Sequence, residues 1–274
     1  MRVEELLVYG KKHCHSEHAK ILLAELLDKN PLELLNFLDL EVDEEKVNLY
    51  KEEVEAIKKG KPLQYVLGKV NFYGNYFEID ENVLIPRFET EELVENTINY
   101  INRFFTYPVD IADLGCGSGV IGLTLEQKVS TFSVDLIDIS KKAIEITHKN
   151  CAKLNSKANI IENDFLEGIP RKYDVIISNP PYIKTDEKIE KIVKDNEPHL
   201  ALYAGEDGLD CYRKILKDIK NHIKDKCLIA FEIGSTQADD IKELVKEYLG
   251  EVKVEVKQDL QERDRMLFIL INLV

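Results

Sequence analysis

From residue 109 onward, short apolar segments alternate with longer amphipathic segments, and this alternation limits the fold more than any other feature of the sequence. The pattern predicts strands at 109–114, 132–138, 158–162, 173–178 and 227–233, and helices at 120–126, 141–154, 211–223 and 238–249. Such alternation is typical of a parallel sheet with helices on both faces. Two further strands, near 252–258 and 266–273, have only a short link and are expected to form an antiparallel hairpin. The predicted fold class is therefore α/β, with a seven-stranded and mostly parallel sheet.

The first 66 residues have a different pattern and are expected to form a separate helical domain, 1–66. Leucines recur at helical spacing between positions 22 and 38, and Pro31 suits the first turn of a second helix. Asp43 is expected to cap a third helix. Ser16 is expected to cap the helix that contains the first leucines. The three histidines and the cysteine between positions 13 and 18 are therefore interpreted as surrounding a helix start, not as metal ligands.

Residues 67–86 change character again. Aromatic and β-branched residues on both sides of Gly74 predict a β-hairpin. We interpret this hairpin as the linker between the helical domain and a second domain at 87–274. A helix over 91–103 is expected to follow it.

Composition excludes several classes of function. The 51 acidic residues outnumber the 37 basic ones, so the formal net charge is -14. Such a surface repels phosphate backbones, and stable nucleic-acid binding is not expected. No apolar run reaches the roughly 18 residues that a membrane-spanning helix needs, and the first residues lack a signal-peptide pattern. The five cysteines include no Cys-x-x-Cys pair, which argues against a disulfide framework or a zinc ribbon. We therefore expect a cytoplasmic protein with no bound metal and no membrane partner.

A glycine-rich turn follows the strand at 109–114. In an open α/β sheet, ligands bind at the carboxyl ends of the strands, and glycines let the backbone approach a ligand closely. The spacing Gly-x-Gly-x-Gly differs from the Gly-x-Gly-x-x-Gly of dinucleotide-binding turns. Asp138 ends the next strand, where a carboxylate can accept hydrogen bonds from both ribose hydroxyls. The pattern predicts a nucleoside-cofactor site made by Gly115, Cys116, Gly117, Ser118, Gly119 and Asp138.

A weaker signal follows the strand at 158–162. The carboxylate of Asp164 could accept the amine of an adenine, and the ring of Phe165 could cover its face. Equally, Asp164 could cap a helix and Phe165 could belong to the core. The residues alone leave both interpretations open.

The strongest chemical signal is the sequence Asn-Pro-Pro-Tyr, which directly follows the strand at 173–178. Prolines lack an N–H, so the turn offers carbonyl oxygens and few competing donors. The side-chain oxygen of Asn179 and the carbonyl of Pro180 could each accept one N–H of a planar –NH2 group. An amide nitrogen is a weak nucleophile, and two fixed acceptors beside a methyl donor would orient it and favour the charge that develops on it. The candidate catalytic residues are therefore Asn179, Pro180, Pro181 and Tyr182, with no acid–base dyad.

The order of these segments resembles the S-adenosylmethionine-dependent methyltransferases, and among them the release-factor glutamine methyltransferases, also called PrmC or HemK. The resemblance covers most of the chain. It also includes 62–68 (PLQYVLG), 83–90 (VLIPRFET), 197–198 (EP), 205–208 (GEDG), 231–234 (FEIG) and 259–265. Phe88 stands where the family usually has proline, and Cys116 stands where it often has threonine.

The resemblance implies a Rossmann-like methyltransferase domain and a helical N-terminal domain that grips the substrate protein. It implies methyl transfer from S-adenosyl-L-methionine, with S-adenosyl-L-homocysteine as the product. Separately, we expect a monomeric enzyme. The substrate would be class 1 peptide-chain release factors, at the side-chain amide nitrogen of the glutamine in their Gly-Gly-Gln loop. By the same resemblance, residues 115–119 lie near the methionine part of the cofactor, Asp138 holds the ribose and Phe165 lies against the adenine. Asp164 and Asn179 complete the cofactor site, and residues 179–182 form the glutamine pocket.

Two alternatives remain. The exocyclic amine of adenine in DNA or RNA is also a planar –NH2 group, but a base in a duplex would have to be flipped out, and the acidic balance argues against this substrate. A non-enzymatic binding module would show damage in the glycine turn or in the Asn-Pro-Pro-Tyr loop, and both are intact.

Overall fold

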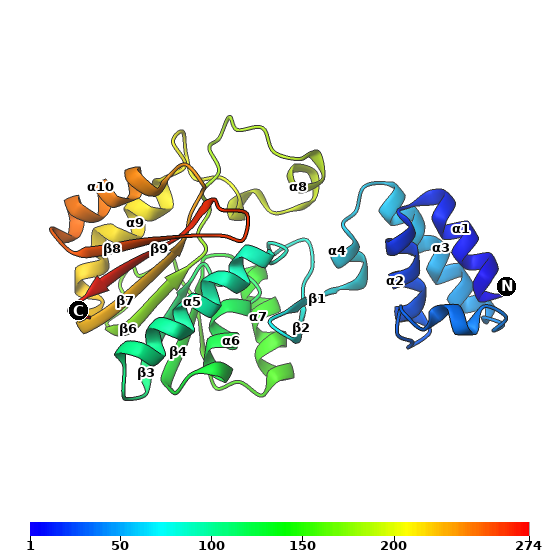
Figure 1. Ribbon diagram of the computed structural model, residues 1–274, viewed down its shortest axis with the longest axis horizontal. Coiled ribbons are helices and arrows are strands. Elements are labelled where there is room, and N and C mark those ends of the chain that lie inside the picture. Colours follow the sequence, from blue (N-terminus) through cyan, green and yellow to red (C-terminus); the bar gives the residue numbers. More distant parts are fainter. Residues whose placement is uncertain (274) are drawn as a thin grey trace. The chain divides into compact units, whose positions relative to one another are not determined.

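The computed structural model describes residues 1–273, which divide by their internal contacts into two units (Figure 1). Unit 1 consists of Met1–Lys69 together with Lys191–Asn196. Unit 2 consists of Val70–Glu190 and the described chain from Glu197 onward.

Unit 1 is helical. Its helices are α1 (Val3–His13), α2 (Ser16–Leu26), α3 (Glu44–Lys58), α4 (Leu63–Leu67) and α8 (Lys191–Asn196), with a 3-10 turn η1 (Leu34–Phe37). Its core contains buried leucines of α1 and α2 and the fully buried Tyr50 of α3. The Tyr50 hydroxyl donates to the carbonyl of Ala19 at 3.1 Å, which joins α3 to α2. Asn196 of α8 donates to the carbonyl of Gly60 at 2.9 Å.

Three expectations for this part of the chain need correction. Helix α1 was not expected, and α2 is capped by the Nδ1 of His15, which accepts from the N–H of Glu17 at 3.4 Å, and not by Ser16. The predicted helix over 31–38 is wrong, because the segment forms turns and only η1. The carbonyl groups of Leu38 and Leu40 accept hydrogen bonds from the first turn of α1, at 3.1 Å each, so tertiary pairing overrides the helical leucine spacing.

Unit 2 contains a seven-stranded sheet. Its strands are β3 (Val109–Leu114), β4 (Thr131–Asp138), β5 (Asn159–Glu162), β6 (Tyr173–Ser178), β7 (Ile223–Glu232), β8 (Lys253–Gln258) and β9 (Asp264–Ile271). Their order in space is β5-β4-β3-β6-β7-β9-β8. The first five strands in this order pair in parallel, and β9 pairs antiparallel with both β7 and β8. The predicted α/β class and the C-terminal antiparallel hairpin are confirmed.

Helices cover both faces of this sheet (Figure 1). One face packs against α5 (Phe88–Phe104), α6 (Val120–Lys128) and α7 (Lys141–Leu154), and the other against α9 (Asp210–Asp218) and α10 (Ala238–Leu249). Successive residues of a strand point to opposite faces, so Ile111 belongs to the first core and Ala112 to the second. Strands buried on both sides explain the nearly continuous apolar runs in the sequence.

The predicted helix over 211–223 is too long. Helix α9 ends at Asp218, a 3-10 turn η3 (Ile219–Asn221) follows, and Ile223 already begins β7. Ile223 pairs with Tyr173 of β6, whose N–H donates to the carbonyl of His222 at 2.8 Å. Pairing with the neighbouring strand therefore ends the helix before its amphipathic pattern does. A further 3-10 turn, η2, spans His199–Ala201.

The expected β-hairpin is present as β1 (Lys69–Phe72) and β2 (Asn75–Glu78). Tyr73 and Gly74 form its turn with φ of 50° and 84°, as a two-residue hairpin turn with positive φ at both positions requires. The side chain of Asn150 in α7 pairs with both backbone groups of Glu78, at 2.7 and 2.9 Å. Among residues 1–273, no helix combines the length and the apolar character needed to cross a bilayer.

Gly10 should be essential to the packing of unit 1. A Cβ at this position would lie 2.1 Å from the Tyr50 hydroxyl oxygen and 2.7 Å from the Cβ of Ala19. We expect Gly10→Ala to lower the free energy of unfolding by about 1–3 kcal/mol, measured by urea denaturation. Val8→Ala, in the half-exposed position two residues earlier in α1, serves as control and should change it by less than about 0.5 kcal/mol. Equal stability of the two variants would contradict the close packing at Gly10.

Candidate active site

The two strongest sequence motifs follow two strands that lie side by side. Strands β3 and β6 pair in parallel, with Leu114 opposite Ser178. The Ser178 hydroxyl donates to the carbonyl of Leu114 at 2.6 Å and fixes the ends of the two strands to each other. On one side of this pair the sheet continues with β4, and on the other with β7, so the strand order reverses between β3 and β6. Ligands in open α/β sheets bind at such a reversal, beyond the carboxyl ends of the strands.

A cavity of about 340 Å³ lies at this position, within the range typical of small-molecule sites. Of the predicted site residues, nine line it: Gly115, Cys116, Gly117, Ser118, Asp138, Asp164, Phe165, Asn179 and Pro181. Gly119, Pro180 and Tyr182 are not among the residues that line the cavity. All the lining residues belong to unit 2.

The glycine turn takes its shape from backbone conformations that favour glycine. Gly115, Gly117 and Gly119 have φ of 68°, 56° and 81°. The N–H of Gly117 donates to Oδ2 of Asp138 at 2.8 Å, and the N–H of Ser140 donates to Oδ1 at 2.8 Å. Burial raises the pKa of Asp138. Each carboxylate oxygen has a second lone pair, so Asp138 still has acceptor capacity for a ligand hydroxyl.

Asp164 and Phe165 line the cavity beside the glycine turn. Phe165 has a φ of 50°, and a Cβ added to Gly115 would lie 3.7 Å from its ring. Lys214 of α9 forms an ion pair with Asp164 and also lines the cavity. The ring of Phe165 also packs against the core on the α9 side of the sheet. The two interpretations of Phe165, cavity wall and core residue, are therefore compatible.

The Asn-Pro-Pro-Tyr loop presents a side-chain acceptor at the cavity. The half-buried Asn179 donates its Nδ2 to the hydroxyl oxygen of Thr90 at 3.2 Å, and its Oδ1 has no donor among residues 1–273. Pro180 is buried. The Tyr182 hydroxyl donates to Oε1 of Glu232 at 3.4 Å, and burial together with the Glu232 charge raises the pKa of Tyr182. The hydroxyl group of Tyr182 is thus already hydrogen-bonded to Glu232, whereas the side-chain oxygen of Asn179 is available to a ligand.

Gln237 holds this loop in place. Its Nε2 donates to the carbonyl of Tyr182 at 3.0 Å and to that of Gly208 at 3.2 Å, and its Oε1 accepts from the N–H of Gly234 at 2.9 Å. The loop also passes close to Gly208, where a Cβ would lie 2.5 Å from the Tyr182 carbonyl oxygen. One buried amide therefore joins the segments that contain Tyr182, Gly208 and Gly234.

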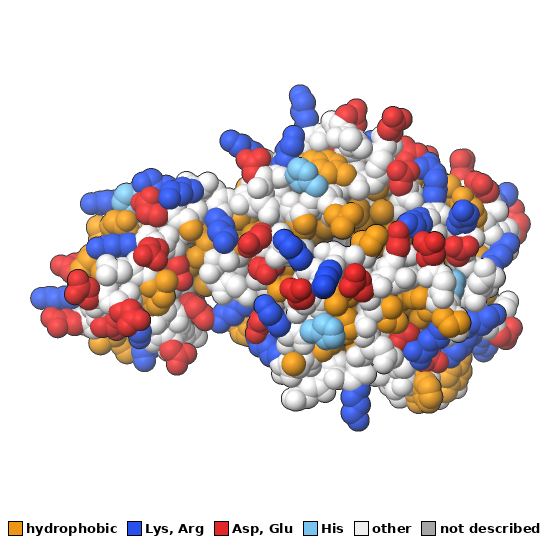
Figure 2. All heavy atoms as spheres, turned by 180° about the vertical axis from the view of Figure 1, so that it is seen from behind, with side chains coloured by type: hydrophobic (Ala, Val, Ile, Leu, Met, Phe, Trp, Pro, Cys, Tyr) orange, Lys and Arg blue, Asp and Glu red, His pale blue; other side chains and the backbone are white. Residues whose placement is uncertain are grey.

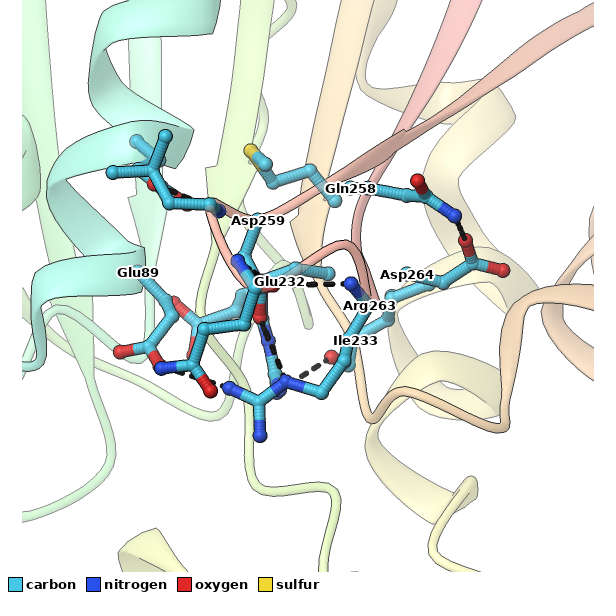
Figure 3. A network of polar contacts seen from close by, with 12 residues as sticks. Glu89, Glu232, Ile233, Gln258, Asp259, Arg263 and Asp264 are labelled. Carbon is cyan, nitrogen blue, oxygen red and sulfur yellow. Dashed lines mark hydrogen bonds and ion pairs between the residues drawn. The ribbon is translucent and has the colours of Figure 1, made fainter.

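Charged side chains form a network beside the carboxyl end of β7 (Figure 3). Arg263 and Arg265 both pair with Asp259, at 3.3 Å each, in the segment that joins β8 to β9. Arg263 also reaches Glu89 at the start of α5, at 3.5 Å, and Arg265 donates to the carbonyl of Ile233 at 3.2 Å. The network connects the β8–β9 loop to the end of β7 and to α5.

Several residues of this site carry no local signal in the sequence. Thr90, Lys214 and Gln237 come from α5, α9 and the start of α10, and each reaches the site only through the fold. Glu197 differs from these three, because it lies in the 197–198 segment of the resemblance; its buried carboxylate pairs with Arg87 and accepts from the N–H of Ile85 at 3.3 Å. Among residues 1–273, no group of three or more His, Cys, Asp or Glu side chains is arranged to hold a metal ion.

Comparisons with known proteins agree with this architecture. Residues 97–202 match the family model of the methyltransferase small domain, and residues 15–68 match that of the PrmC N-terminal domain. The release factor glutamine methyltransferase of Bacillus cereus is 36% identical over 98% of this chain and 99% of that protein. The proteins of the same name from Bacillus subtilis and Clostridium acetobutylicum are 36% and 38% identical and cover 93% and 92% of this chain, and 91% and 90% of their own length.

Solved structures show a likeness in fold. The T. Thermophilus 16S rRNA N2 G1207 methyltransferase, in complex with AdoMet and guanosine, has a TM-score of 0.55 at 15% identity and covers 74% of this chain and 49% of its own. The ribosomal protein L11 methylase from Lactobacillus delbrueckii subsp. bulgaricus has a TM-score of 0.50 at 18% identity. The match covers 67% of this chain and 79% of that protein's chain. The Rossmann-like methyltransferase fold is thereby confirmed. With relatives of more than 30% identity over nearly its whole length, the chain is a methyltransferase and belongs to the release factor glutamine methyltransferase family.

Proposed function

We propose that this protein transfers a methyl group from S-adenosyl-L-methionine to the side-chain amide nitrogen of the glutamine in the Gly-Gly-Gln loop of class 1 peptide-chain release factors. The observation that carries this proposal is the free Oδ1 of Asn179 at a cavity that Gly115, Gly117 and Asp138 also line. The names of its relatives support the substrate class. In this proposal the enzyme acts as a cytoplasmic monomer, and residues 1–66 help to grip the release factor.

The residues that line the cavity suit this cofactor. The turn at Gly115 and Gly117 brings backbone close to the cavity with no side chain in the way, as a methionine moiety would need. Asp138 retains lone pairs for ribose hydroxyls, and Phe165 offers a ring face for an adenine. When bound, the cofactor supplies an electrophilic methyl group on a positively charged sulfur.

The residues of the loop would prepare the amide for attack. The Oδ1 of Asn179 and the carbonyl of Pro180 would each accept one N–H of the glutamine –NH2 group. Fixed acceptors would hold the nitrogen in line with the methyl group and stabilise the positive charge that develops on it as the new N–C bond forms and the methyl–sulfur bond breaks. One of the two amide protons would then leave to solvent, which gives the neutral N-methyl amide. The conformation of the loop is held by Gln237, so the acceptors are in position before the substrate arrives.

The direct test is a reaction with purified release factor and isotopically labelled S-adenosylmethionine, followed by mass spectrometry of the digest. We expect a mass increase of one methyl group on the Gly-Gly-Gln peptide and on no other peptide. Transfer to adenine in added DNA or RNA, with the release factor unmodified, would replace this proposal by the nucleic-acid alternative.

Figure 2 shows acidic and basic side chains intermixed over the visible face, in keeping with a protein substrate.

Asn179→Ala removes one acceptor of the reacting amide. We expect kcat to fall by about 100-fold or more, as when one group that stabilises developing charge is lost, with little change in the cofactor Kd measured by calorimetry. Asn221→Ala, at an exposed position in η3 away from the cavity, is the control and should retain the parent kcat. Equal losses in turnover and in cofactor affinity would contradict the proposed role of Asn179.

Gln237→Ala leaves the carbonyl groups of Tyr182 and Gly208 without their shared donor. We expect a loss of about 1–3 kcal/mol in the free energy of unfolding and faster amide hydrogen exchange over residues 182–185, because the loop is no longer held. The matched variant Gln261→Ala lies at an exposed position and should leave both quantities unchanged. Unaltered exchange of the loop in Gln237→Ala would show that the amide does not hold it.

A further inference from the structure

Three side chains form a line of hydrogen bonds that ends at the cavity, which Thr90 and Asn179 line and Glu232 does not. Glu232, at the end of β7, and Thr90, in the first turn of α5, are 1% and 2% exposed. The Thr90 hydroxyl donates to Oε2 of Glu232 at 2.7 Å. The Nδ2 of Asn179 donates to the same hydroxyl oxygen at 3.2 Å. The line therefore runs from a buried carboxyl group to the amide that faces the ligand.

The direction of each hydrogen bond in this line follows from the one before. An ionised carboxylate can only accept, so the single hydroxyl proton of Thr90 is committed to Glu232. The Thr90 oxygen can then only accept on its other side. Asn179 can therefore bond to the Thr90 oxygen only through its –NH2 group. The amide oxygen of Asn179 then points away from Thr90.

A proton on Oε2 of Glu232 would reverse this order. The protonated carboxyl group would donate to the Thr90 oxygen, and the Thr90 hydroxyl would be free to donate to Asn179. The amide of Asn179 could then rotate and accept that hydrogen bond with Oδ1. Its –NH2 group would face the cavity, where a substrate amide also presents hydrogens, and two donors would oppose each other.

We propose that Glu232 and Thr90 are positioning residues that fix the amide orientation of Asn179, with the ionised carboxylate of Glu232 holding the acceptor oxygen toward the substrate. This inference rests on the proposed function, because it assigns the substrate a planar –NH2 group. It adds that the enzyme is active only with Glu232 ionised. Neither residue touches the reacting atoms in this mechanism; both act through Asn179.

The surroundings of Glu232 place the ionisation of its carboxyl group near neutral pH. Burial raises its pKa to about 7, against the lowering effects of the Thr90 hydrogen bond and the Arg265 charge, while the Glu89 charge raises it further. Arg265 is itself paired with Asp259, and the Tyr182 hydroxyl donates to Oε1. From α9, the Tyr212 hydroxyl donates to the backbone carbonyl of Glu232 at 2.7 Å and adds no charge. The carboxylate form dominates above pH 7, so turnover should rise as the pH increases through that value.

The first experiment compares variants of Thr90. Thr90→Val keeps the shape of the side chain but removes the hydroxyl group, and we expect kcat to fall roughly tenfold or more, with the cofactor Kd within about twofold of the parent value. Thr90→Ser keeps the hydroxyl group and should recover most of that loss. The matched control is Thr97→Val, two turns further along α5, where the buried hydroxyl donates only to the carbonyl of Leu93, at 2.7 Å. A kcat of Thr90→Val equal to that of Thr97→Val would overturn the proposal.

The second experiment measures kcat and KM against pH for the parent protein and for Glu232→Gln. The parent protein should lose turnover as the pH falls through about 7, mainly in kcat, whereas Glu232→Gln should have a lower kcat with no such acid limb. An acid limb that persists in Glu232→Gln would contradict the assignment to Glu232.

A readout that needs no substrate separates this inference from the proposed function. The side-chain amide resonances of Asn179, assigned by their loss in Asn179→Ala, should shift with pH around a midpoint near 7 in the parent protein and not in Glu232→Gln. If the parent protein fails to methylate the release factor but shows this titration, the proposed function is wrong and the orientation of Asn179 by Glu232 stands. If methylation occurs and the resonances do not titrate, the proposed function stands and the inference is wrong.

Discussion

The parallel pairing of β3 with β6 is the constraint on which the site depends. These strands are distant in sequence, yet their register sets Leu114 opposite Ser178, and a side-chain hydrogen bond closes the pair. Both strands are fully buried, and a shift of one residue would turn each apolar side chain of β6 to the other face of the sheet. The register is therefore fixed by the two cores, and the glycine turn and the Asn-Pro-Pro-Tyr loop are brought together as a consequence.

The sequence predicts this frame well because its signals are local. Each strand of the parallel sheet is a short apolar run, and the limits of 109–114, 141–154, 173–178 and 238–249 agree with β3, α7, β6 and α10. The errors occur where contacts between distant segments decide the structure. The leucines after Pro31 have helical spacing, but the carbonyls of that segment pair with α1. The amphipathic run after Cys211 ends early because Ile223 pairs with β6.

The candidate site divides in the same way. Cavity-lining residues at or just after the end of a strand, such as Gly115, Asp138 and Asn179, were predicted from the sequence. Residues that support them come from elsewhere: Thr90 precedes Asn179 by 89 positions, and Gln237 follows Tyr182 by 55. A threonine or a glutamine has no pattern of its own, so its partner is known only from the fold. In the arrangement proposed above, Thr90 is the unpredicted residue that determines which way the amide of Asn179 points.

Helix α8 has a consequence for any attempt to divide the polypeptide. Its six residues belong with the N-terminal helices, while the segments before and after them belong with the sheet. A truncated protein that stops at Lys69 would therefore lack the six residues of α8 and the hydrogen bond from Asn196 to the carbonyl of Gly60. A fragment that starts at Val70 would keep α8 without that hydrogen-bond partner. Studies of the isolated halves would need α8 grafted onto the first fragment and a short replacement loop in the second.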